Sequence, residues 1–339
     1  MPKTLLEVQD LKKHFPIKKG FFRKQVVGAV KAVDGVSFTI DRGEIVGLVG
    51  ESGCGKTTTG RMILSIIQPS GGRILYHDES GVVDVGTLNK QELWRLRRKT
   101  QMVFQDPYSS LNPRMTVQEL VQEPLICYNI GTPEEQKQKV IDMLKVVGLD
   151  PRYMTRYPHA FSGGQRQRIG IARALILRPE LVVADEPVSA LDVSIQAQIL
   201  NLLSDLQEQF NLTILFISHD LAVVNHLCHR TMVMYLGKIV EIAPTDELFA
   251  KPLHPYVEVL LSAVPRPEAG FRFSEITMRG EVAAPSEQPI GCPFSPRCKY
   301  AAERCRNEAP ELRHIGDTDS SHLVSCHFAE SLNLSGIAQ

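Results

Sequence analysis

The sequence predicts an α/β fold with helices packed on both faces of a sheet, and three observations support this prediction. Short apolar segments suited to buried strands alternate with helical patterns along most of the chain. One apolar segment, residues 44–49, leads into the glycine-rich sequence G-E-S-G-C-G-K-T-T at 50–58 and then into a helical pattern. Another, residues 181–184, ends in two adjacent acids. Ligands bind at strand ends in such sheets, so both junctions are candidate sites.

The composition limits the class of protein. At 339 residues the chain is long enough for two domains. A formal net charge of zero argues against nucleic acid as the main partner, because such proteins usually carry a basic excess. There is no run of 18 apolar residues that would span a membrane, and residues 1–10 lack the apolar block of a signal peptide. Seven cysteines, unevenly placed, do not fit a secreted disulfide scaffold.

The N-terminal stretch predicts two strands around a basic segment. Residues 5–11 alternate as a strand does, and residues 30–40 predict a second strand that turns into the one at 44–49. Residues 12–24 between them are basic and aromatic. They form either a solvated loop or a place where Phe15 or Phe22 stacks on a purine ring.

The stretch 50–58 fits the phosphate-loop pattern G-x-x-x-x-G-K-[ST]. Glycine accepts positive φ and has no Cβ, so backbone N–H groups can close around phosphate oxygens, and the helix N-terminus adds its dipole. We expect Lys56 to reach the β- and γ-phosphates and the Thr57 hydroxyl to bind Mg²⁺. A chance glycine-rich turn is the alternative, which the flanking strand and helix disfavour. The predicted nucleotide-binding residues here are Gly50, Ser52, Gly53, Gly55, Lys56, Thr57 and Thr58.

The middle of the chain begins with weaker patterns. Residues 73–85 predict short antiparallel strands, and residues 93–99 a basic helix. A strand at 101–104 ends at Gln105, because the proline two residues later cannot continue a β-ladder.

Helices then dominate. Within residues 116–148, Thr132 before a Pro-Glu pair is the predicted N-cap of one helix. The sequence F-S-G-G-Q-R-Q-R opens another at 165–177. After the acid-ended strand come a helix at 193–210 and a strand at 213–217.

Four polar residues at strand ends are candidates for the chemistry. Asp185 would hold Mg²⁺ through water, and Glu186 would orient or deprotonate the attacking water as general base. The amide of Gln105 could touch both Mg²⁺ and that water, and His219 could contact the γ-phosphate and fix Glu186. An acidic strand end that simply faces solvent is the alternative, and the order of all these elements along the chain favours the functional interpretation.

With S-G-G-Q at 162–165 and S-A-L-D at 189–192, that order resembles the ATPase subunit of an ABC transporter. The resemblance implies an ABC nucleotide-binding domain at 1–245: a P-loop NTPase (RecA-like) core, an antiparallel β subdomain and a helical signature subdomain at about 107–178. Two such domains would pair head to tail, each ATP lying between one phosphate loop and the partner's S-G-G-Q, while residues 105–133 face a membrane subunit. The added nucleotide-binding residues are Ser162, Gly163, Gly164, Gln165 and Asp192.

Longer stretches resemble the importers of dipeptides and oligopeptides, a group that includes nickel importers. They are Q-D-P-Y-S-S-L-N-P-R-M-T-V at 105–117, D-E-P-V-S-A-L-D-V-S at 185–194, L-H-P-Y at 253–256 and L-L-S-A-V-P-R-P at 260–267. The resemblance implies an ATP-hydrolysing subunit at the cytoplasmic face of the membrane, with peptides as cargo and nickel as the alternative. Its partners would be a second, related ATPase chain, two membrane permease subunits and an extracytoplasmic binding protein.

The predicted extension at 246–339 carries Cys292, Cys298, Cys305 and Cys326. The stretch after Pro265 has few apolar runs, so a bound metal would supply missing stability. Disulfides are disfavoured without a signal peptide, and unligated thiols are a second alternative. The C-x-x-C pairs usual for zinc are absent. A [4Fe–4S] cluster accepts wider spacing, and the resemblance associates similar cysteines with one, so we predict this cluster, with zinc second.

Two rival functions remain. A soluble ABC ATPase acting on DNA or the ribosome usually has two ATPase halves or a long coiled-coil insertion, and the sequence shows neither. A regulatory module that binds ATP without turnover is disfavoured by the intact Glu186 and His219.

Overall fold

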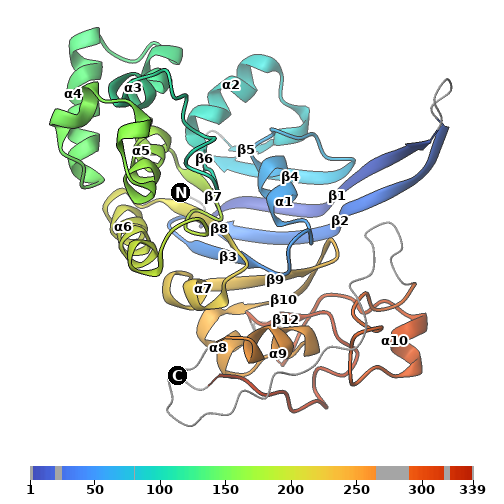
Figure 1. Ribbon diagram of the computed structural model, residues 1–339. Helices are drawn as coiled ribbons and strands as arrows, with labels where there is room; N and C mark the ends of the chain where they lie inside the picture. The colour runs from blue at the N-terminus through green and yellow to red at the C-terminus, as the bar shows by residue number, and fades with distance from the viewer. Residues whose placement is uncertain (1–2, 20–24, 80, 265–289, 317–320, 338–339) are drawn as a thin grey trace. The chain divides into compact units, whose positions relative to one another are not determined.

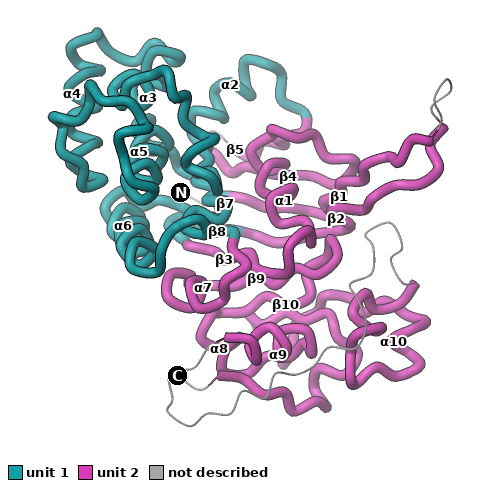
Figure 2. The backbone as a smooth tube through the Cα atoms, viewed as in Figure 1, with its two compact units in different colours: residues 1–5, 40–44, 87–217 teal, residues 6–39, 45–86, 218–339 magenta. Residues whose placement is uncertain are grey.

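The computed structural model describes residues 3–19, 25–79, 81–264, 290–316 and 321–337 (Figure 1). The chain forms two compact units (Figure 2). The first comprises residues 1–5, 40–44 and 87–217, and the second comprises residues 6–39, 45–86 and 218–339. The acid-ended strand and S-G-G-Q therefore belong to the first unit, and the phosphate loop and the four C-terminal cysteines to the second. The domain boundary at 245 and the helical subdomain at 107–178 stay predictions.

Parallel strands form the sheet described in the first unit. They are β6 (Thr100–Val103), β7 (Leu181–Asp185) and β8 (Thr213–Ser218), in that order. Every residue of β7 and β8 is buried, as expected for parallel strands covered on both faces. Because parallel strands end at the same edge, the residues that follow β6 and β7 are neighbours there.

The helices described in the first unit are α2 (Lys90–Lys99), α3 (Val117–Cys127), α4 (Pro133–Val146), α5 (Gly163–Leu175) and α6 (Val193–Phe210), with short 3₁₀ turns η2 (Pro151–Thr155) and η3 (Pro158–Ala160). Thr132 is the N-cap of α4, as predicted, and Pro133 is its first residue. Capping boxes also begin α2, α3 and α5, so side chains satisfy backbone N–H groups at these helix starts.

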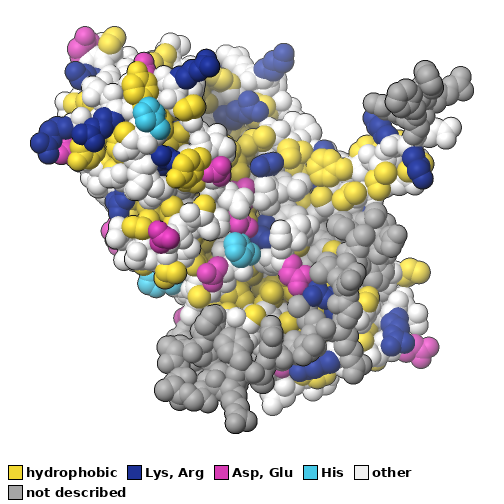
Figure 3. Space-filling model, viewed as in Figure 1, with side chains coloured by type: hydrophobic (Ala, Val, Ile, Leu, Met, Phe, Trp, Pro, Cys, Tyr) yellow, Lys and Arg dark blue, Asp and Glu magenta, His cyan; other side chains and the backbone are white. Residues whose placement is uncertain are grey.

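Helices α3, α4 and α5 pack on one another, and α5 also packs on α6 and β6 (Figure 1). On the face drawn in Figure 3, basic and acidic side chains are interspersed over these helices. This distribution agrees with the formal net charge of zero.

An antiparallel sheet lies almost wholly in the second unit. Its strands, in the order β2-β1-β4-β5, are β1 (Thr4–Lys19), β2 (Gln25–Asp41), β4 (Gly71–Asp78) and β5 (Gly81–Asp84), and β5 is followed by the 3₁₀ turn η1 (Val85–Thr87). Both β1 and β2 are longer than predicted: β1 continues through Lys19 into the basic stretch, so the solvated-loop interpretation is wrong for residues 12–19. The two strands are hydrogen-bonded neighbours, and this pairing keeps their half-buried and exposed residues extended.

The remaining strands of the second unit are β3 (Ile45–Val49), β9 (Arg230–Tyr235), β10 (Lys238–Pro244), β11 (Arg313–His314) and β12 (Leu323–Val324). β3 is parallel to β9, whereas β10 is antiparallel to β9 and to β12. The described helices here are α1 (Lys56–Ile63), α7 (Leu221–Leu227), α8 (Thr245–Ala250), α9 (Pro255–Ser262) and α10 (Glu303–Asn307). Among the described residues, every helix is too short or too polar to cross a membrane.

The C-terminal extension shares its core with the rest of the second unit. Phe294 is buried against Tyr235 of β9 and Tyr256 of α9, with ring centroids 5.4 Å from each. The fully buried Glu241 of β10 lies 2.7 Å from His322 and accepts the N–H of Leu253. The segment around Phe294 is thus fixed by buried contacts to β9 and α9.

Candidate nucleotide-binding site

The predicted phosphate loop connects β3 to α1. Gly50 has φ 150° and Gly55, the N-cap of α1, has φ 112°. A Cβ at Gly50 would collide with the carbonyl oxygen of Met234, and one at Gly55 with that of Ala32. The loop therefore follows a path, close against two backbone segments, that only glycine permits at these positions.

Lys56 is 5% exposed, and its ammonium donates to the carbonyl oxygens of Gly50 (2.7 Å) and Glu51 (3.0 Å). The positive charge of Lys56 thus lies beside the backbone of the loop, where a phosphate group would bind. Ser52 and Gly53 are exposed on the loop, and Thr57 and Thr58 are half-buried at the start of α1.

Cys54, inside the loop, behaves as a small buried residue. Burial raises the pKa of its thiol above the usual value, although the nearby Lys56 ammonium acts in the opposite direction. The thiol stays protonated at neutral pH and is a poor nucleophile.

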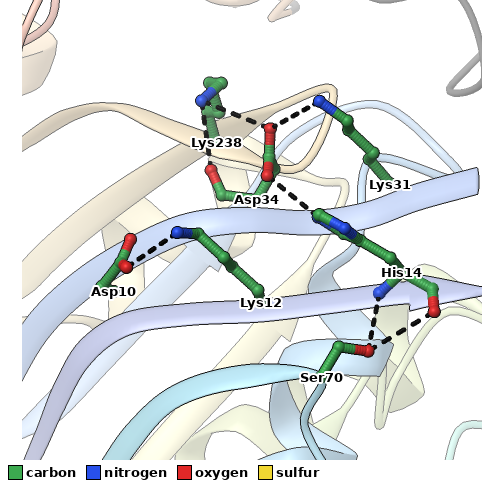
Figure 4. Close-up of polar contacts among 7 residues, drawn as sticks. All are labelled: Asp10, Lys12, His14, Lys31, Asp34, Ser70 and Lys238. Carbon is green, nitrogen blue, oxygen red and sulfur yellow. Dashed lines mark hydrogen bonds and ion pairs between the residues drawn. The ribbon is translucent and has the colours of Figure 1, made fainter.

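Phe15, the candidate for stacking on a base, is 39% exposed on β1, with the Lys13 ammonium 5.2 Å from its ring centroid. Phe22, the other candidate, lies outside the described residues. His14, next to Phe15, is held by Asp34, 2.9 Å from its Nε2 (Figure 4).

Asp34 is the centre of a charged network that includes Lys31 and Lys238, each 3.6 Å away (Figure 4). Burial alone would raise the pKa of Asp34, but Lys238, His14 and Lys31 together lower it. Backbone bonds extend this network to the phosphate loop: Asp34 N–H donates to Gly237 (2.8 Å), and Gly237 N–H donates to Cys54 (2.9 Å). The strand that carries Phe15 is thereby connected to the loop.

The structure brings together Gln105 and Glu186, which were both expected beside the attacking water. The Gln105 amide donates to the Glu186 carboxylate at 3.0 Å, across 81 positions of sequence. Glu186 has φ 46°, in the left-handed region, and its N–H donates to the carbonyl of Ile217 (2.9 Å). Asp185, the last residue of β7, is 3% exposed, and His219 is exposed just after β8. The contacts expected of Asp185 with Mg²⁺ and of His219 with Glu186 stay predictions.

S-G-G-Q begins α5, which packs on α6, the helix that follows S-A-L-D. Ser162 and Gln165 form a reciprocal capping box, which does not use the amides of Gly163 and Gly164. A Cβ on Gly164 would collide with the Ile195 side chain, which explains a glycine at this position. Asp192, at the N-cap of α6, is exposed.

Two arginines of α5 hold the stretch that follows Gln105. The Arg166 guanidinium lies 3.9 Å from the centroid of the Tyr108 ring, and Arg173 donates to the carbonyl of Ser110 (2.8 Å). Neither contact is predictable from the sequence, because neither residue pair follows a periodic pattern.

The four C-terminal cysteines line one pocket, together with Phe294 and His254. All are free thiols. Burial raises the pKa of Cys292 to about 12 and of Cys326 to about 11, and neighbouring thiols act in the same direction. Among the described residues, however, no group of three or more His, Cys, Asp or Glu side chains could hold a metal ion.

Comparison with solved structures defines the class. The ATP-binding cassette MJ0796, solved as a dimer bound to ADP and Pi, is 29% identical with a TM-score of 0.61, over 71% of this chain and 98% of that one. The protein cbiO1 from Clostridium perfringens, part of the ABC transporter complex cbiONQ, is 28% identical with a TM-score of 0.62, over 74% and 92%. A family model described as ABC transporter matches residues 33–189. The chain is an ABC ATPase, and the predicted α/β fold with antiparallel and helical parts is confirmed.

Sequence comparison defines the branch of this class. A second model, described as the C-terminal region of oligopeptide/dipeptide transporters, matches residues 240–305. The oligopeptide transport ATP-binding protein AppF of Bacillus subtilis is 51% identical over 96% of this chain and 97% of its own length. The dipeptide transport ATP-binding protein DppF of Haemophilus influenzae is 48% identical over 95% and 96%. The chain belongs to the family of oligopeptide and dipeptide ABC transporter ATP-binding proteins.

Proposed function

We propose that this chain hydrolyses ATP to drive the import of dipeptides or oligopeptides. The observation that carries the proposal is the match of residues 240–305 to the C-terminal region of oligopeptide/dipeptide transporters, a region outside the match to the general ABC model. Full-length similarity to AppF and DppF, both named for peptide transport, supports the same cargo.

In the proposed reaction, the phosphate loop binds the triphosphate and Lys56 neutralises its charge. Glu186 accepts a proton from the attacking water, oriented by the hydrogen bond from Gln105. Thr57 and Asp185 offer oxygen donors of the kind that Mg²⁺ prefers, and the ion would offset negative charge on the phosphates. His219 would contact the γ-phosphate.

The proposed partners follow from the transporter family. Two ATPase chains would pair, with S-G-G-Q of each closing the other's site, and the second would be a related but different chain. They would bind two permease subunits at the cytoplasmic face of the membrane. An extracytoplasmic binding protein would deliver peptides to these permeases. The dimer of MJ0796 supports the pairing.

Uptake of labelled dipeptides, longer peptides and nickel by cells that carry wild type or Glu186→Gln tests the cargo. We expect loss of peptide uptake alone, because the variant should stop hydrolysis without removing the subunit. Loss of nickel uptake alone would replace the cargo and keep the mechanism. Unchanged uptake of all three would contradict an importer role and favour an ABC ATPase that is not linked to transport.

We also propose that the four C-terminal cysteines hold a [4Fe–4S] cluster. Their convergence on one pocket supports a shared ligand, and such raised thiol pKa values require a strong cation to form thiolates. Zinc sites usually contain C-x-x-C pairs, which these four cysteines lack. A cluster spreads four thiolates over several irons, so their sulfurs can lie farther apart.

Iron content tests the cluster. Protein purified without oxygen is expected to contain iron and to be brown in colour. Cys298→Ser is expected to lose both the iron and the colour, because one thiolate ligand is missing. Cys127→Ser is the matched control, since that cysteine is exposed on α3. Zinc in place of iron would select the alternative, and colourless wild-type protein without metal would exclude both.

A further inference from the structure

The C-terminal extension reaches the phosphate loop through an ion pair. Nη1 of Arg297 lies 3.1 and 2.9 Å from the two carboxylate oxygens of Glu51, the second residue of the loop. These residues are 246 positions apart, and Arg297 directly precedes Cys298. The side chains are 6% and 24% exposed, so the pair is largely shielded from water.

Buried aromatic residues fix both partners of this ion pair. The hydroxyl of Tyr256, a fully buried residue, accepts the N–H of Glu51 at 2.9 Å. The hydroxyl of Tyr235 lies 3.4 Å from Nη1 of Arg297. Both tyrosines pack on Phe294, three residues before Arg297. The guanidinium therefore cannot follow Glu51 freely if the loop moves.

The ion pair between Arg297 and Glu51 is not explained by a gain in folding stability. Nε of Arg297 is buried and has no hydrogen-bond partner among the described residues. An unsatisfied buried donor destabilises a protein, and burying an ion pair rarely repays the desolvation of both charges. A hydrophobic residue would satisfy the packing, so the arginine needs another explanation.

Charge at the loop supplies that explanation. Glu51 places a carboxylate in the loop that must accept a highly negative triphosphate, and like charges repel strongly where water is excluded. The backbone of Glu51 also accepts a hydrogen bond from Lys56. An unpaired or displaced Glu51 would therefore both repel the phosphates and draw the lysine away from them.

We propose that Arg297 is a positioning residue of the phosphate loop: by neutralising and anchoring Glu51, it makes ATP affinity depend on the C-terminal extension. This inference rests on the proposed function of the loop in ATP binding. It assigns the extension a role in the nucleotide site of its own chain, beyond any role of its cysteines.

The test is ATP affinity of the full-length chain, measured by titration, with the melting temperature measured beside it. Arg297→Met is expected to weaken ATP binding about 10- to 100-fold, because it leaves the half-buried carboxylate of Glu51 unpaired beside the phosphates. Adding Glu51→Gln to it should restore affinity to within about threefold of wild type, since the repelling charge is gone. Arg297→Lys should retain most of the affinity because it keeps the charge.

Arg304→Met is the matched control, since it breaks an exposed ion pair with Glu308 in the same extension. An unchanged affinity in Arg297→Met, or a loss that Glu51→Gln does not rescue, would overturn the proposal. If Arg297→Met does not fold, Arg297→Gln replaces it with the same expected loss and rescue. Failure of wild type to bind ATP would instead contradict the proposed function itself.

Discussion

Glu186→Gln is expected to reduce steady-state ATP hydrolysis by about 10²- to 10⁴-fold, the usual contribution of a general base. The amide cannot accept the proton of the attacking water. It keeps an oxygen that can accept the hydrogen bond from Gln105, which is 3.0 Å long in the native chain. ATP binding should therefore persist while turnover stops. Phosphate release and ATP affinity, measured on the same preparation, separate the two effects.

Glu208→Gln, an exposed position on α6, is the matched control and should leave the rate unchanged. A hydrolysis rate that survives Glu186→Gln would mean that another group activates the water. Loss of ATP binding together with turnover would mean that the carboxylate shapes the site and is not only its base.

Lys56→Ala is expected to weaken ATP binding by about 10- to 100-fold, which corresponds to the loss of charge-assisted hydrogen bonds. The ammonium is buried and already directed at the loop by its bonds to Gly50 and Glu51. Residues 50–58 contain no second lysine that could replace Lys56. Equilibrium titration with ATP measures the loss.

The exposed Lys137 of α4 provides the control, and Lys137→Ala should bind ATP as wild type does. Unchanged affinity in Lys56→Ala would remove the loop from its central role in the nucleotide site, whatever the hydrolysis rate.

Local patterns predicted the elements of the sheet and helices well, because burial on both faces leaves a continuous apolar run. They failed at the ends of β1 and β2, where residues 12–19 and 25–29 are half-buried or exposed and are held extended by pairing between strands. Pairing between two strands leaves no regular alternation in the sequence where few of the paired residues are buried.

The candidate site shows the same division. Gln105 and Glu186 were both expected beside the attacking water, because each follows a strand, and the pairing of β6 with β7 brings them into contact. The contact of Arg297 with Glu51 was not predictable, because it depends on where an irregular segment returns to the fold. The sequence around Arg297 does not indicate that this residue lies beside the phosphate loop.

The left-handed backbone at Glu186 has a consequence for protein engineering. A residue with a Cβ pays about 1 kcal/mol or more to adopt this conformation, whereas glycine adopts it freely. A library selected for heat resistance alone would therefore favour glycine at position 186 and discard the proposed base. Thermostable versions of this chain should be selected for turnover as well.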